Sequence, residues 1–188
     1  MNEQMKQGAP APSAEYALGF DPERVMLLRR SGAVWEELGD ARFDGADLHG
    51  DLAALKDRIA SDSPAGHVLR LVIPDDQILY TQLSLAPAPS RIQALRNALD
   101  GLTPYRVADL AFDWQDLTGG SPDAPEGTVR VAAVARQTLR EAEEFALRHG
   151  FEPESFVAAP ANDDFPRPPS FGQTRSAGAR EQQGFGAG

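Results

Sequence analysis

The sequence contains no cysteine, which excludes disulfide bonds, thiolate nucleophiles and zinc sites that use sulfur ligands. It has no GxxxxGK[ST] loop, so neither a Walker-type ATPase nor a GTPase is predicted. No apolar run approaches the roughly 20 residues that a membrane helix needs. Residues 1–15 also lack the apolar core of a signal peptide. We therefore expect a cytoplasmic chain that does not itself insert into a membrane.

Clusters of positive charge are also missing. The chain has 18 basic and 28 acidic residues, a formal net charge of −10, and its longest basic run is Arg29-Arg30. Proteins that bind nucleic acids concentrate lysine and arginine on one face, because phosphate contacts dominate their affinity. Nucleic acid is therefore not expected as a partner.

No pattern in the sequence predicts a metal site or a catalytic centre. The three histidines are far apart, and the paired carboxylates of Asp75-Asp76 and Asp163-Asp164 are typical of solvated turns or tails. A two-metal nuclease needs several converging carboxylates, and nothing indicates that Asp21, Asp75 and Asp113 converge. His149 is interpreted as a residue at a helix C-terminus, where a positive charge favours the helix dipole. We predict no cofactor and no enzymatic activity.

Composition divides the chain into three parts. Residues 1–14 are polar and are predicted to be a disordered lead-in. Residues 161–188 are rich in proline and glycine and hold almost no aliphatic side chains. Such a segment buries too little apolar surface to offset the entropy of ordering it, so a disordered tail is predicted. The folded domain is expected within residues 15–160.

The domain is predicted to begin with three antiparallel strands, because short apolar runs at 16–20, 25–30 and 34–43 are separated by turn residues. A helix follows, with Asp44 or Asp47 as its cap and an apolar stripe at helical spacing: Leu48, Leu52, Leu55 and Ile59. The nearly continuous apolar run at 68–73 is typical of a strand that is covered on both faces.

The second half of the domain repeats strand and helix signals. Strands are predicted at 78–85, 110–114, 129–135 and 156–159. Ser90 is expected to cap a helix whose apolar face holds Ile92, Leu95, Leu99 and Leu102. Thr138 is expected to cap another, with Leu139, Ala142, Phe145 and Ala146 inward and Gly150 as its C-cap. The predicted class is α/β, with a mixed sheet, an antiparallel meander and the order βββ-α-ββ-α-ββ-α-β.

The stretch 102–117, LTPYRVADLAFDWQDL, is the most distinctive segment. Thr103-Pro104 should end the second helix, because a residue before proline avoids helical geometry. Phe112 and Trp114 are two apart on a strand and so face the same side. They either pack under the second helix or, with Tyr105, form an exposed surface for a partner. Ile78, Tyr80 and Gln82 share one side of strand 78–85 and are further candidates for binding a partner.

Three segments in order carry a family resemblance: VLRLVIPDDQILYTQLSLA (68–86), the helix and TPYRVADLAFDW (91–114), and VAAVARQTLREAEEFALRHGFEPESFVAA (131–159). Together with the βββαβ start, they resemble the PilM family of type IV pilus assembly proteins and the cytoplasmic domains of the GspL family of type II secretion proteins. The resemblance implies a ribonuclease-H-like, actin-like lobe. It also implies a docking role at the inner face of a bacterial inner membrane, with an inner-membrane assembly protein or a secretion ATPase as partner.

The same resemblance raises a nucleotide-binding alternative, in which a second lobe lies outside this chain. Actin-like proteins that use ATP contact phosphate through a hairpin after the first strand, and residues 19–24 (GFDPER) match its position. Asp21 is retained there and is a weak candidate for binding a nucleotide, but the favoured interpretation is that it stabilises the turn between the first two strands. Pro22 has no N–H to donate, and the charge of Glu23 would repel phosphate. A non-catalytic module that docks proteins is therefore the favoured hypothesis.

Overall fold

The computed structural model describes residues 14–32, 34–117, 127–160, 165 and 167–184. The elements are β1 (Ala14–Phe20), β2 (Arg24–Ser31), β3 (Val34–Arg42), α1 (Leu48–Asp62), β4 (His67–Ile73), η1 (Asp75–Gln77), β5 (Ile78–Ser84), α2 (Arg91–Leu99), η2 (Val107–Asp109), β6 (Leu110–Asp116), β7 (Thr128–Ala135), α3 (Arg136–Arg148), β8 (Ser155–Ala158), β9 (Ser170–Gln173) and α4 (Arg175–Gly184), where η marks a 3-10 helix. The order as far as β8 is the one predicted from the sequence. Residues 1–13 of the expected lead-in and Asp163-Asp164 lie outside the described residues.

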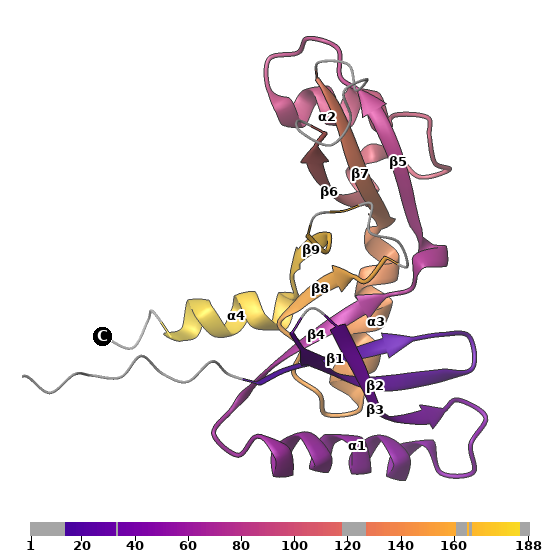
Figure 1. Ribbon diagram of the computed structural model, residues 1–188, viewed down its shortest axis with the longest axis vertical. Helices are drawn as coiled ribbons and strands as arrows, with labels where there is room; N and C mark the ends of the chain where they lie inside the picture. The colour runs from indigo at the N-terminus through magenta and orange to yellow at the C-terminus, as the bar shows by residue number, and fades with distance from the viewer. Residues whose placement is uncertain (1–13, 33, 118–126, 161–164, 166, 185–188) are drawn as a thin grey trace, which may run out of the picture.

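Six strands form the large mixed sheet at the base of the molecule in Figure 1, in the order β3-β2-β1-β4-β8-β9. The first three strands form the predicted antiparallel meander. β4 then pairs in parallel with both β1 and β8, because helical crossovers return the chain to the same end of the sheet. The predicted α/β class with a mixed sheet is thereby confirmed.

Helices α1 and α3 both pack on one face of this sheet. Of the predicted apolar stripe of α1, Leu52, Leu55 and Ile59 are buried and Leu48 is partly buried. Gly39 on β3 leaves room for the side chain of Leu55. From α3, the ring of Phe145 meets that of Phe20 on β1. Asp47 rather than Asp44 caps α1, since its side chain accepts a hydrogen bond from the N–H of Gly50.

The smaller sheet is antiparallel, in the order β5-β7-β6, and stands with α2 at the upper end of Figure 1. A second hydrophobic core joins it to α2, consisting of Leu95, Leu99, Val129, Val131 and Ala133. Half-buried side chains from β5, β6 and η2 pack against this core. Leu95 and Leu99, two of the apolar residues predicted for this helix, therefore form the face of α2 that packs on the sheet.

Two predicted helix ends are wrong. α2 ends at Leu99, so Leu102 lies beyond the helix and is exposed; Ile92, in the first turn, is also exposed rather than part of the buried face. Thr138 is not the cap of α3, because the helix already begins at Arg136, directly after the buried strand β7. Periodicity does not reveal such short strand-to-helix junctions. Gly150 is confirmed as a left-handed residue after α3, with φ of +78°.

The predicted disordered tail is also wrong over residues 170–184. β9 pairs with the edge of β8, and Phe171 and Ala177 are buried. The first turn of α4 is held by Glu143 of α3, whose buried carboxylate accepts hydrogen bonds from the N–H of Ser176 (2.9 Å) and from Nε of Arg175 (3.3 Å). Composition missed this segment because its partners, an open strand edge and a buried carboxylate, are supplied by distant residues.

Candidate functional site

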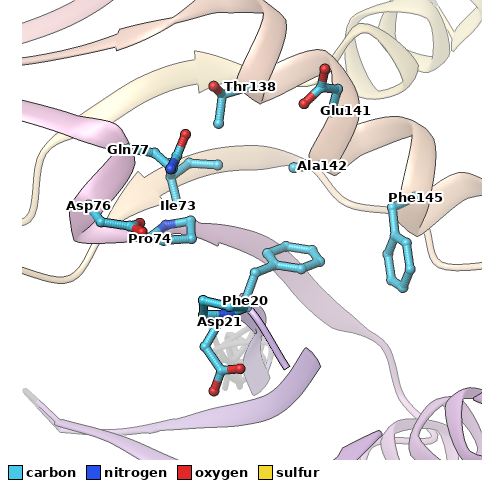
Figure 2. A pocket seen from close by; sticks show the side chains of 11 residues that line it. Phe20, Asp21, Ile73, Pro74, Asp76, Gln77, Thr138, Glu141, Ala142 and Phe145 are labelled. Carbon is cyan, nitrogen blue, oxygen red and sulfur yellow. The ribbon is translucent and has the colours of Figure 1, made fainter. Parts of the chain in front are cut away.

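A pocket of about 330 Å³ lies at the ends of β1 and β4, where the β1–β2 turn, η1 and α3 meet (Figure 2). The residues that line it come from three separate stretches of the chain: Phe20, Asp21 and Pro22; Ile73, Pro74, Asp76 and Gln77; and Thr138, Glu141, Ala142 and Phe145. The volume is at the small end of the range for ligand sites. The pocket includes the hairpin position that the sequence suggested for a nucleotide.

Asp21 is engaged within its own turn. Its Oδ1 accepts hydrogen bonds from the N–H of Glu23 (2.8 Å) and the N–H of Arg24 (2.9 Å). Its Oδ2 accepts one from Nε of Arg24 at 3.2 Å. These interactions, first the hydrogen bond from Glu23, lower the pKa of Asp21 below its ordinary value. The side chain of Asp21 therefore stabilises the turn, which is the role that the sequence analysis favoured.

The charged residues that line the pocket are all acidic: Asp21, Asp76 and Glu141. Arg24 lies behind Asp21 and is already shared among Asp21, Glu37 and Asp40. A phosphate site needs backbone N–H donors or cations, and here the hairpin presents a proline and a carboxylate. The pocket is thus electrostatically unsuited to a triphosphate.

Aromatic rings form one wall of the same pocket. The ring of Phe145 contacts that of Phe20 edge to face, with centroids 5.7 Å apart, and that of Phe43 at 5.9 Å. The ring of His149 lies 4.7 Å from that of Phe145. The apolar surface thus continues from the pocket across Phe145 to the exposed ring of Phe43.

The structure brings two of the three histidines together, which their spacing in the sequence did not suggest. The rings of His49 and His149 are 6.1 Å apart. Burial, then the proximity of His49 and of Arg148, lowers the pKa of His149. His149 does cap α3, but the predicted favourable charge at the helix end is opposed by these effects. No cluster of three or more metal-binding side chains occurs in the part of the chain that the structure describes.

The residues proposed from the sequence to bind a partner do not form one surface. Phe112 and Trp114 are half-buried against the core under α2, which favours the packing interpretation. Ile78 is buried, Gln82 is exposed, and Tyr105 is 49% exposed in the turn after α2. Strand pairing places Ile78, Tyr80 and Gln82 on the face of the small sheet opposite Phe112 and Trp114.

The face around Tyr80 is partly covered by the chain itself. The hydroxyl of Tyr80 donates a hydrogen bond to Asp75 (2.7 Å), and its ring lies 5.7 Å from that of Phe165. Burial and the neighbouring Asp75 raise the pKa of Tyr80. On β6, at the other edge of the same sheet, Asp113 accepts hydrogen bonds from Arg167 (2.6 Å) and from the N–H of Ser170 (2.9 Å).

Sequence reasoning did not find the pocket as a whole. It singled out Asp21, it interpreted Phe145 as a core residue, and it placed Asp76 in a solvated turn. The pocket is assembled by the parallel pairing of β1 with β4 and by the return of α3, contacts between residues more than 50 positions apart. No local motif could have indicated this arrangement.

No protein-family model matches the chain, and no curated protein matches it. Among solved structures, it resembles the cytoplasmic domain of EpsL, an inner membrane component of the type II secretion system of Vibrio cholerae, with a TM-score of 0.53 and 15% sequence identity over 80% of this chain and 61% of that one. The chain therefore spans about three fifths of the length of that domain. The resemblance to a GspL-type cytoplasmic domain that the sequence suggested is confirmed at the level of the fold.

Two further solved structures are similar to a lesser degree. A PilM–PilN type IV pilus biogenesis complex matches with a TM-score of 0.48 and 19% identity, over 74% of this chain and 45% of that one. A Bacteroides thetaiotaomicron protein of unknown function with an actin-like ATPase fold matches with a TM-score of 0.38 and 11% identity, over 82% and 55%. Among the described residues, no helix combines the length and apolar character needed to cross a membrane.

Proposed function

We propose that this chain is a non-catalytic module that docks other proteins in a secretion-type or pilus-type assembly. The observation that carries the proposal is the lining of the pocket, where three carboxylates and a proline surround the hairpin position that the sequence suggested for a nucleotide. The fold likeness to the EpsL cytoplasmic domain supports the choice of assembly. Its partner would be an inner-membrane assembly protein or a secretion ATPase, with no role for nucleic acid.

In this proposal the chain works in the cytoplasm at the inner face of the inner membrane, where such a partner would hold it. The net charge of −10 disfavours direct binding to anionic lipid or nucleic acid, because like charges repel. Exposed apolar side chains of the small subdomain, Ile92, Leu102 and Tyr105, offer surface for a protein contact. Among the described strands, β5 pairs with β7 alone, so its outer edge offers main-chain hydrogen bonds to an added strand.

The alternative is a nucleotide-binding protein that shares its site with a second lobe. It is supported by the position of Asp21 beside a pocket with an aromatic wall, which could hold a base. The acidic lining opposes it, since a nucleoside triphosphate would bring several negative charges next to Asp76 and Glu141.

Titration calorimetry separates the two functions. The chain should bind at least one purified inner-membrane component or ATPase of a type II secretion or type IV pilus system from the same cell, and it should show no heat with Mg-ATP up to about 1 mM. We also expect no hydrolysis of ATP. Binding of Mg-ATP below about 100 μM that is abolished by Asp21→Ala, with no binding to any of these proteins, would replace the docking function with the nucleotide function.

A further inference from the structure

The pocket between the β1–β2 turn, η1 and α3 combines an apolar floor with an acidic rim. The floor is formed by Phe20, Ile73, Pro74, Ala142 and Phe145, and the rim carries the carboxylates of Asp21, Asp76 and Glu141. Figure 2 shows the rings of Phe20 and Phe145 on one side of the pocket and the side chains of Asp76 and Glu141 on elements that face each other across it. Such a lining complements a group that is apolar along its length and positively charged at its tip.

Two of the rim carboxylates are available for such a group. Asp76 and Glu141 are exposed, and neither forms an ion pair with any residue that the structure describes. The polar contact of the Glu141 carboxylate is with the side-chain amide of Gln137, at 2.8 Å. Asp21 differs from both, because Arg24 and the backbone of the turn already neutralise it. A cation entering the pocket would therefore meet negative charge that no described residue neutralises through an ion pair.

We propose that this pocket receives a lysine or arginine side chain from an extended, apolar-flanked segment of a protein partner. The aliphatic stem would lie on Phe20 and Phe145, and the charged head would reach Asp76 and Glu141. The aromatic faces add attraction for a cation, which is strongest for arginine. This inference rests on the proposed docking function and names the chemistry of one contact.

The charge of the whole chain favours the same occupant. A net charge of −10 attracts basic partners over distance and raises their rate of encounter. A purely apolar side chain would fill the floor but would make no use of the rim carboxylates. A phosphate-bearing ligand would bring like charges together.

The test uses three synthetic peptides that differ at one position: acetyl-Gly-Leu-Arg-Leu-Gly-amide and its analogues with glutamine or glutamate in place of arginine. Binding is followed by nuclear magnetic resonance on the ¹⁵N-labelled full chain. We expect the arginine peptide to shift the amides of the β1–β2 turn, η1 and the first turns of α3. The glutamine peptide should bind at least about fivefold more weakly, and the glutamate peptide should leave these amides unshifted.

Variants then locate the charge contact. The double variant Asp76→Asn/Glu141→Gln should weaken binding of the arginine peptide by about tenfold, since two ion pairs are lost without a change in shape. The matched control Asp57→Asn/Glu154→Gln changes the net charge equally at exposed positions outside the pocket, and should bind like the wild type. Glu141→Arg should reverse the preference and bind the glutamate peptide. Melting temperature and circular dichroism verify that each variant is folded.

Four results would overturn the inference. Equal weakening by the control variant would show general charge attraction, and displacement of the peptide by Mg-ATP with shifts of the same amides would show a nucleotide site. A wild-type dimer in sedimentation that is absent in the Asp76→Asn/Glu141→Gln variant would show that a second copy occupies the pocket.

If a secretion or pilus protein binds this variant as tightly as wild type, the inference fails while the docking function stands. If no such protein binds wild type, the docking function itself fails, whatever the peptides do.

Discussion

Replacing Leu95 by alanine tests whether the small subdomain has a core of its own. Leu95 lies at the middle of α2, is fully buried, and packs with Leu99, Val129 and Val131. α2 is the helix that covers this face of the small sheet, so the cluster has few alternative contacts with which to fill a vacancy.

The expected loss of unfolding free energy is about 3 kcal/mol. Leucine to alanine removes three buried carbons, each worth about 0.8 kcal/mol of transfer free energy. The cavity left behind raises the cost further, so that comparable substitutions span about 2.7–5.0 kcal/mol. A value toward the lower part of that range is expected, because the half-buried rings of Phe112 and Trp114 can shift toward the space.

Urea unfolding measures the effect, with tryptophan fluorescence and circular dichroism recorded together. The chain has two tryptophans, Trp35 in β3 and Trp114 in β6. In a Trp35→Phe background, fluorescence reports on the small subdomain alone. Ile92→Ala is the matched control: the residue lies one turn earlier on the same helix and is 37% exposed, so the substitution should cost less than about 1 kcal/mol.

Two outcomes would refute this picture. Losses below about 0.5 kcal/mol for both variants would mean that this face of α2 is not buried. Equal and large losses would mean that Ile92 is as buried as Leu95, and that α2 sits on the sheet differently.

Three further predictions concern the second half of the chain. Phe171→Ala should lower the free energy of unfolding by about 3 kcal/mol, because a buried ring is lost from β9; no change in urea unfolding would return residues 170–184 to the predicted disordered tail. Gly150→Ala should cost about 1 kcal/mol in thermal unfolding, because φ is +78° there, and an unchanged melting temperature would contradict the left-handed C-cap. Although burial alone raises the pKa of Asp113, hydrogen bonds from Arg167 and Ser170 outweigh it and hold that pKa below its ordinary 3.8. The stability from this contact is therefore complete above about pH 3.8 and lost as the pH falls through the lowered value. The protection factor of the Ser170 N–H, which is the intrinsic exchange rate at each pH divided by the observed rate, should therefore fall only in acid, and in Asp113→Asn this acid-dependent fall should disappear.

The sequence by itself determined the local elements and much of the core. Alternating or continuous apolar residues indicated eight of the strands, and leucines at helical spacing indicated which faces of α1 and α2 are buried. These features depend on short-range periodicity and turn chemistry, which each segment carries alone. The same local chemistry indicates Asp21 as a turn residue, and its hydrogen bonds to Glu23 and Arg24 agree.

Only the tertiary structure decided what lies next to what. β9 is ordered because it pairs with the edge of β8, and α4 is ordered because the buried carboxylate of Glu143 binds its first turn. Neither partner can be recognised from the composition of residues 161–188. Likewise, Tyr80 and Asp113 share one face of the small sheet, and Arg167 covers part of that face through its ion pair with Asp113. The sequence does not indicate this contact, because the two paired residues are far apart in the chain. The pocket combines a β-turn, a 3-10 helix and a helix more than 50 residues away, so its acidic rim exists only once parallel pairing and helix packing have brought these segments together.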